Sequence, residues 1–440
     1  MVISKEDSNG RIHIGAGNMA FFTVGSGDPC FSFAYSVTLK KPVDPEIYLQ
    51  ALKKTLARYW NYRLRPMIEH ADGRADLYFV NNTDEPKVFY DEGQRFNLGT
   101  EETAHYLFVA LYKDNTITIR AFHGIVDGRG GLSFIKTLTY YYLALSEGAQ
   151  IGHDDVLTDE IPEDDTERVC EYETFGDKDA DPFYMPELDN IYVADEDRTP
   201  MAQGRTVRYN VRCDLRSLLE KTKKLRVTVT PWLNTILGRA VYAVYDIEKD
   251  MKVVGTCPVD GRAMYNVHSL TAFGTTIKLL YDRRFNELSF DAAVKMERAL
   301  MELQLTKANF EKEFFETEQS TNLLIKEAPT PVMFAVPQFL ELLNSAHAKS
   351  TYTITNIGPL TFNADMQRYV ESIRVSTVCR TPEIVFAITS CGNELNILIS
   401  QFFERSALAD KVAELLTEQG VDAEVSRLPD FYTDKLMYDF

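Results

Sequence analysis

Two kinds of hydrophobic spacing alternate along the first half of the chain. Residues 31–40 and 115–122 alternate apolar and polar positions, which is the spacing of half-buried strands. Residues 44–58 and 132–145 instead repeat apolar positions every three or four residues, which predicts helices with one buried face. Further strand-like runs lie at 77–80, 87–90 and 106–111. Because predicted strands and helices are interspersed, we expect an α/β fold.

The second half repeats this succession of elements. A strand is expected at 205–211, a helix after Cys213, and a helix at 232–245 with Pro231 in its first turn. Strand-like runs then follow at 252–257, 275–280, 351–355, 385–389 and 396–400. Between the halves, residues 151–200 are rich in Asp and Glu, which predicts a solvated crossover. Since 440 residues exceed one ordinary core, we predict an N-terminal lobe at 1–200, including this crossover, and a C-terminal lobe at 201–440.

Composition narrows the class of protein. A hydrophobic content of 45% and an aromatic content of 12% are sufficient for a packed globular protein. A net charge of −18 argues against a nucleic-acid partner, because cations are needed to replace phosphate counterions. The six cysteines are scattered without a C-x-x-C pair, so we expect reduced thiols and no metal site. Neither a secretory signal nor a membrane span is evident, and a cytoplasmic protein is expected.

One short segment carries recognisable chemistry. His123 follows a predicted strand and precedes Asp127-Gly128 at the start of a predicted helix, with Gly130 and Gly131 next. Glycines there allow positive φ and close backbone approach. A histidine at a strand end, oriented by a nearby carboxylate, suits a general base. An ordinary strand-to-helix turn fits the same residues, because Asp-Gly is common turn chemistry.

Several segments together resemble the chloramphenicol-acetyltransferase-like superfamily, in particular condensation domains and stand-alone O-acyltransferases. Their H-H-x-x-x-D-G signature corresponds here to residues 122–128, with Phe122 in place of the first histidine. Residues 43–63 are similar to the first helix and the corner after it. Residues 258–262 with 273–275, and residues 353–358, resemble two further motifs in the expected order. The resemblance spans roughly residues 30 to 400.

This resemblance implies two lobes, each a mixed β-sheet flanked by helices, with the active-site channel at their interface. It implies that His123 is the general base in direct acyl transfer from a thioester to a hydroxyl, and that Asp127 pairs with Arg262. The backbone N–H of Gly128 and the side chain of Asn356 are candidate donors to the oxyanion. A solvent-facing Arg262 and an ordinary strand-end Asn356 are the plainer alternatives.

The expected cosubstrate is an acyl-CoA or an acyl-carrier-protein thioester, with a small-molecule acceptor and no resident cofactor or metal. Two other functions stay open: an amide-forming, condensation-type enzyme, and a catalytically inactive binding protein on the same fold. One basic cluster interrupts the acidic chain, at Lys221, Lys223, Lys224 and Arg226. It fits either the phosphates of coenzyme A or an acidic carrier, or simply the solvated C-terminal turn of a helix.

Overall fold

The computed structural model describes most of the chain. The described residues are 2–4, 6–23, 29–71, 74–148, 150–171, 190–194, 203–314, 316, 350–378 and 384–437. The acidic crossover predicted at 151–200 is therefore described only at 151–171 and 190–194. Within all these residues, no helix combines the length and the apolar character needed to cross a bilayer.

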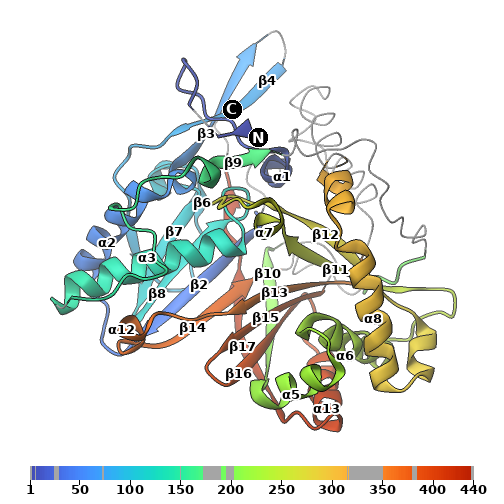
Figure 1. Cartoon of the computed structure of the whole chain (residues 1–440). Coiled ribbons are helices and arrows are strands. Elements are labelled where there is room, and N and C mark those ends of the chain that lie inside the picture. Colours follow the sequence, from blue (N-terminus) through green and yellow to red (C-terminus); the bar gives the residue numbers. More distant parts are fainter. Residues whose placement is uncertain are drawn as a thin grey trace.

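A five-stranded sheet lies at the centre of the first half (Figure 1). Its strand order is β14 (Val370–Thr377), β2 (Ser32–Leu39), β8 (Thr116–Phe122), β7 (Phe108–Lys113) and β5 (Val88–Tyr90). The sheet is mixed, because β5 runs parallel to β7 while the other neighbours are antiparallel. Two long helices pack together beside it, α2 (Pro45–Arg58) and α3 (Gly128–Glu147).

Both helices start at a capping aspartate. Asp44 accepts hydrogen bonds from the N–H groups of Glu46 and Ile47 at 2.9 and 3.1 Å, with Pro45 at the first helical position. Helix α3 begins four residues earlier than the apolar spacing predicts, because Asp127 caps it through the Gly130 N–H at 2.9 Å. Sequence spacing finds the apolar body of a helix more readily than a polar, glycine-rich first turn.

A seven-stranded sheet forms the second half. Its strand order is β12 (Gly274–Tyr281), β11 (Val253–Asp260), β13 (Tyr352–Pro359), β15 (Ile384–Cys391), β16 (Glu394–Gln401), β10 (Arg205–Asp214) and β17 (Ala423–Tyr432). β13 runs parallel to both β11 and β15, so this sheet is mixed as well. Four helices gather beside it in Figure 1: α5 (Leu215–Leu225), α6 (Val229–Val244), α8 (Phe290–Gln304) and α13 (Ala407–Glu418). The α/β fold class predicted from the sequence is confirmed.

Shorter elements accompany the two sheets. The paired strands are β3 (Leu64–Ala71) with β4 (Arg74–Asn81), β1 (Val2–Ile3) with β9 (Val169–Glu171), and β6 (Asn97–Leu98) with β18 (Lys435–Leu436). The short α-helices are α1 (Ala16–Met19), α7 (Arg262–Tyr265) and α12 (Ala364–Gln367). The 3₁₀ turns are η1 (Ala20–Thr23), η2 (Trp60–Arg63), η3 (Glu101–Thr103), η4 (Asp165–Arg168) and η5 (Arg283–Glu287).

Each large sheet has its own buried hydrophobic cluster, but the chain crosses between them. β14 comes late in the sequence yet pairs with β2, and Met366, Val370 and Ile373 pack in the first cluster. This late strand was not predicted from the sequence; a bulge between Val370 and Ser372 interrupts its alternation. A division of the chain near residue 200 remains a prediction. β14 lies after this division in the sequence but belongs to the sheet of the first half.

The acidic crossover is not uniformly solvated. Glu167, one of its carboxylates, is 4% exposed and lies against Arg58 at the end of α2. Two hydrogen bonds of 2.7 and 2.6 Å join the guanidinium and the carboxylate. The prediction of a solvated run is therefore wrong at Glu167, because pairing with a buried arginine allows one carboxylate to leave water.

Candidate active site

His123 stands directly after β8, where the first sheet ends. Its backbone N–H donates to the Phe31 carbonyl at 2.7 Å, which extends the pairing of β8 with β2 by one residue. The imidazole stacks on Phe21 with ring centroids 4.5 Å apart. Phe33 and Phe31 meet it edge-on at 5.2 and 6.2 Å. Three aromatic rings therefore fix the plane of the imidazole.

The two ring nitrogens of His123 have different surroundings. Nδ1 is buried and has no hydrogen-bond partner among the described residues. The residue as a whole is half-buried, and Nε2 is not among the fully buried nitrogens that lack a partner. Burial lowers the pKa of His123 below its ordinary value of 6.5, against smaller upward effects from its own backbone and from Asp127. At neutral pH the imidazole is therefore uncharged and able to accept a proton at Nε2.

Asp127 and Arg262 form a two-pronged ion pair across the two halves. The guanidinium Nη1 lies 2.8 Å from Oδ2, and Nη2 donates to Oδ1 at 2.9 Å. The two side chains are only 13% and 19% exposed, for arginine and aspartate respectively. A solvent-facing Arg262 is thus excluded. This geometry fixes both distance and orientation, which a single contact would not do.

Arg262 uses all five of its N–H groups. Besides Asp127, it donates to the Ser269 carbonyl at 2.7 Å, the Thr271 carbonyl at 2.6 Å and Asp260 at 3.0 Å. Burial by itself would lower the pKa of Arg262, but the Asp127 and Asp260 carboxylates raise it above its ordinary value. The residue therefore holds loop 266–273 of the second half against the start of α3.

The glycines of the motif serve close packing. Gly128, Gly130 and Gly131 all lie outside the left-handed region, so of the two things that glycine allows here, the structure uses close approach and not positive φ. A Cβ on Gly130 would lie 2.3 Å from the Leu270 carbonyl oxygen, and one on Gly131 would lie 2.9 Å from the rings of Phe33 and Tyr35. Only a residue without a side chain lets α3 approach β2 and loop 266–273 this closely.

Gly128 and Asn356, the two candidate oxyanion donors, differ in what they contact. The Gly128 carbonyl accepts a hydrogen bond from the Tyr35 hydroxyl at 2.6 Å, while its N–H, at the first position of α3, has no acceptor among the described residues. Asn356 on β13 donates to Thr230 Oγ1 at 3.2 Å and accepts from the Gly358 N–H at 3.1 Å. Among the described residues, neither His123 nor Asp127 hydrogen-bonds to the Asn356 side chain. Gly128 is therefore the better placed of the two beside the motif.

Two asparagines support the motif and were missed from sequence. Asn18, buried in α1, donates to the Gly124 carbonyl at 3.0 Å. Asn61, in η2, donates to the carbonyls of Ile125 and Leu270 at 3.0 and 3.1 Å. No sequence pattern around Asn18 or Asn61 indicates that its side chain binds backbone carbonyls of the motif. Two of the three rings around His123, Phe31 and Phe33, fall on one face by the alternation of residues 31–35, whereas Phe21 comes from a separate segment.

Metal ligands do not gather in the part of the chain that the structure describes, where no group of three or more His, Cys, Asp or Glu side chains could hold an ion. Cys30, Cys213 and Cys257 are buried thiols and Cys391 is half-buried. The side chains of Cys170 and Cys379 lie outside the described residues.

No protein-family model and no curated protein sequence matches the chain. Solved structures match it in fold. Polyketide synthase associated protein 5 from Mycobacterium tuberculosis superposes with a TM-score of 0.58 at 10% identity, over 94% of this chain and 98% of its own. TRI101 from F. sporotrichioides, complexed with coenzyme A and T-2, gives 0.61 at 12% identity over 94% and 99%. A variant of the starter condensation domain of rhizomide synthetase, in complex with C8-CoA, gives 0.60 at 12% identity over 93% and 94%.

These proteins share the chloramphenicol-acetyltransferase-like fold, and this chain has that fold. The coverage of both chains shows that the likeness extends over both halves. At identities this low, the likeness establishes the architecture and not the activity.

Proposed function

We propose that the chain is an acyltransferase that moves an acyl group from a thioester to a hydroxyl, with His123 as general base. The observation that carries the proposal is the imidazole itself: it is uncharged at neutral pH, held by three aromatic rings, and not fully buried at Nε2. The Asp127–Arg262 pair holds the loop beside it in place. A histidine whose only role was to fill a turn would need none of this support.

The proposed reaction proceeds by direct transfer. Nε2 of His123 takes the proton of the acceptor hydroxyl as its oxygen attacks the thioester carbonyl. The negative charge that develops on the carbonyl oxygen is stabilised by the Gly128 N–H at the start of α3. The carbon–sulfur bond then breaks, and the leaving thiolate takes the proton back from the imidazolium. Asp127 positions the loop and does not itself exchange a proton.

Acyl-CoA is the proposed donor. The support comes from two of the structural neighbours, which were solved with coenzyme A and with C8-CoA. A hydroxyl acceptor is favoured over an amine because Phe122 replaces the first histidine of the condensation-domain signature. Phe122 is fully buried and packs edge-on against Phe22 at 4.8 Å, so its position contributes only packing.

His123→Ala tests the proposal. We expect thiol release from an acyl-CoA in the presence of an acceptor alcohol to fall by at least ~100-fold, because general-base catalysis contributes about 10²–10⁴ in rate. The exposed His153 offers a control, and His153→Ala should leave the rate unchanged. Both variants should melt like the unaltered protein. A panel of alcohols and amines tests the acceptor class in the same assay.

The pH dependence provides a second measurement. Because the pKa of His123 is lowered, the acid limb of the rate profile should lie below pH 6.5, with activity lost as the imidazole gains a proton. A folded His123→Ala variant that retains full turnover, or an acid limb above pH 6.5, would contradict His123 as the base. The absence of turnover with any thioester would favour a binding protein on this fold.

A further inference from the structure

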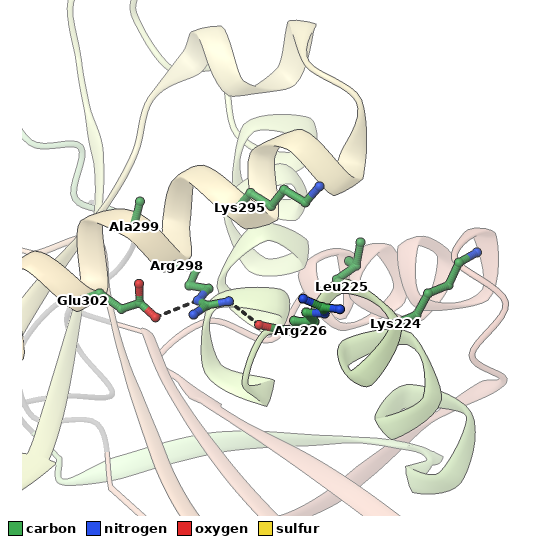
Figure 2. A pocket seen from close by; sticks show the side chains of 7 residues that line it. All are labelled: Lys224, Leu225, Arg226, Lys295, Arg298, Ala299 and Glu302. Carbon is green, nitrogen blue, oxygen red and sulfur yellow. Dashed lines mark hydrogen bonds and ion pairs between the residues drawn. The ribbon is translucent and has the colours of Figure 1, made fainter.

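A basic cleft lies on the second half between the last turn of α5 and the middle of α8 (Figure 2). Its volume is about 490 Å³, which is within the usual range of small-molecule sites. The cleft is lined by Lys224, Leu225, Arg226, Lys295, Arg298, Ala299 and Glu302. Figure 2 shows the guanidinium groups of Arg226 and Arg298 near its centre, while Lys224 and Lys295 extend from its two walls.

The cleft holds four cations and a single carboxylate. That carboxylate, Glu302, is taken by Arg298, whose Nε lies 2.7 Å from Oε1. Arg298 also donates to the Arg226 carbonyl, so its guanidinium is held in place across the two helices. Among the described residues, no carboxylate pairs with Lys224, Arg226 or Lys295. The cleft is therefore strongly positive in a chain in which 65 acidic residues outnumber 47 Lys and Arg.

Helix electrostatics explain only half of this cluster. Lys224 and Arg226 lie at the C-terminal end of α5, where cations complement the negative end of the helix. Lys295 belongs to the second turn of α8, nearer the end that disfavours cations. A solvated helix end therefore does not account for the convergence of cations from two helices.

The backbone conformation of Arg226 is a second unusual feature of the cleft. This residue closes α5 in the left-handed region, with φ at 57° and ψ at 43°, where glycine is the most favoured residue. An arginine there costs backbone strain that glycine would avoid. Replacing Arg226 with glycine would therefore remove the charge and relieve backbone strain at the same time.

We propose that this cleft binds the phosphates of a nucleotide-sized polyanion. Several convergent cations, one of them a fixed guanidinium, suit phosphate oxygens, and the volume accommodates more than a single phosphate. The ligand is either the nucleotide end of the acyl-CoA donor or a separate nucleotide. The first source rests on the proposed function, whereas the binding of phosphates itself does not.

Binding of adenosine 3′,5′-bisphosphate to the full chain, measured by titration calorimetry, tests the proposal. We expect saturable binding that weakens as salt is added. Arg226→Gly and Lys295→Gln together should weaken affinity by at least about tenfold, through loss of two attractive charges. The exposed Lys249 is the matched control, and Lys249→Gln should change affinity by less than about twofold. Failure of the unaltered protein to bind, or equal losses in test and control, would overturn the proposal.

Arg226→Gly alone separates a ligand contact from a structural role. Glycine relieves the left-handed strain, so this variant should melt no lower than the unaltered protein while binding the bisphosphate more weakly. A lower melting temperature with unchanged affinity would make Arg226 a structural residue and contradict the proposal.

Acyl-CoA turnover distinguishes the two sources of phosphate. If the double variant raises KM for acyl-CoA and leaves kcat unchanged, the cleft holds the donor's nucleotide end. If KM is unchanged while bisphosphate binding is lost, the ligand is a separate nucleotide. His123→Ala should abolish turnover and leave bisphosphate binding intact, so that failure of the catalytic proposal would not be mistaken for failure of this one.

Discussion

Buried ionisable groups are arranged differently in two regions of the molecule. They form ion pairs where the two halves meet, whereas, among the described residues, a carboxyl group lies without a cationic partner in the core of the second half. Around the motif, Arg262 and Asp127 form a two-pronged pair, and Arg58 and Glu167 form another. In the second core, Glu297 on α8 is fully buried and receives one hydrogen bond, from Asn234 at 2.8 Å. Its Oε1 has no partner among the described residues.

The difference shows what each arrangement is suited to. A buried ion pair is stable only in a specific geometry, so it defines how two surfaces meet. A lone buried carboxyl becomes neutral instead, and burial raises the pKa of Glu297 to about 8. The region that positions His123 is thus held by directional pairs, whereas the second core relies on packing around a carboxyl that is protonated at neutral pH.

Breaking the Arg58–Glu167 pair should give the largest loss of stability. Arg58→Met leaves Glu167 buried without its partner, and we expect the free energy of unfolding to fall by about 3–5 kcal/mol. Denaturant titration measures it. Arg284→Met breaks the exposed Arg284–Asp282 contact, whose arginine is 83% exposed, and should cost less than about 1 kcal/mol. Similar losses in the two variants would show that the buried pair is not what holds this region.

Glu297→Gln should change the pH dependence of stability. The raised pKa means that the folded protein keeps a proton that the unfolded chain loses above about pH 4.5, so stability falls as pH rises toward 8. The glutamine variant lacks this dependence. Relative to the unaltered protein, it should therefore gain about 3 kcal/mol between pH 5 and pH 8. Parallel stability curves over this range would contradict a buried, protonated Glu297.

A pair of glycine substitutions tests how closely the two halves pack beside the motif. Gly130→Ala places a Cβ 2.3 Å from the Leu270 carbonyl oxygen and should cost about 1–3 kcal/mol. At Gly128 the nearest atoms, on Ile357 and Tyr35, lie 3.9 Å from such a Cβ, so Gly128→Ala should change stability by less than about 1 kcal/mol. Chemical unfolding of both variants measures the difference. Equal losses of stability in the two variants would mean that loop 266–273 can shift to accommodate the added methyl group, and would contradict close packing at Gly130.

Local patterns predicted most elements of the fold. The spacing of residues 31–40 and 115–122 corresponds to β2 and β8, and the long helices follow from their apolar repeats. The strands β3, β14 and β17 and the helices α8 and α13 were not predicted. β17 has few large apolar residues, so its alternation is weak. β14 is held in its sheet by pairing with β2, which lies far away in the sequence. In α2, Tyr48 lies in the buried face whereas Ala57 is exposed.

The sequence by itself determined the elements, the ordered motifs and the identity of the candidate base, because these depend on neighbours a few residues apart. Tertiary structure alone decided that Asp127 reaches Arg262, 135 residues later, and that Asn18 and Asn61 hold the motif loop. It also brought Lys295 and Arg298 beside Arg226. Such meetings depend on how two sheets and their helices pack, and hydrophobic spacing along one segment carries no information about which distant segment will cover it.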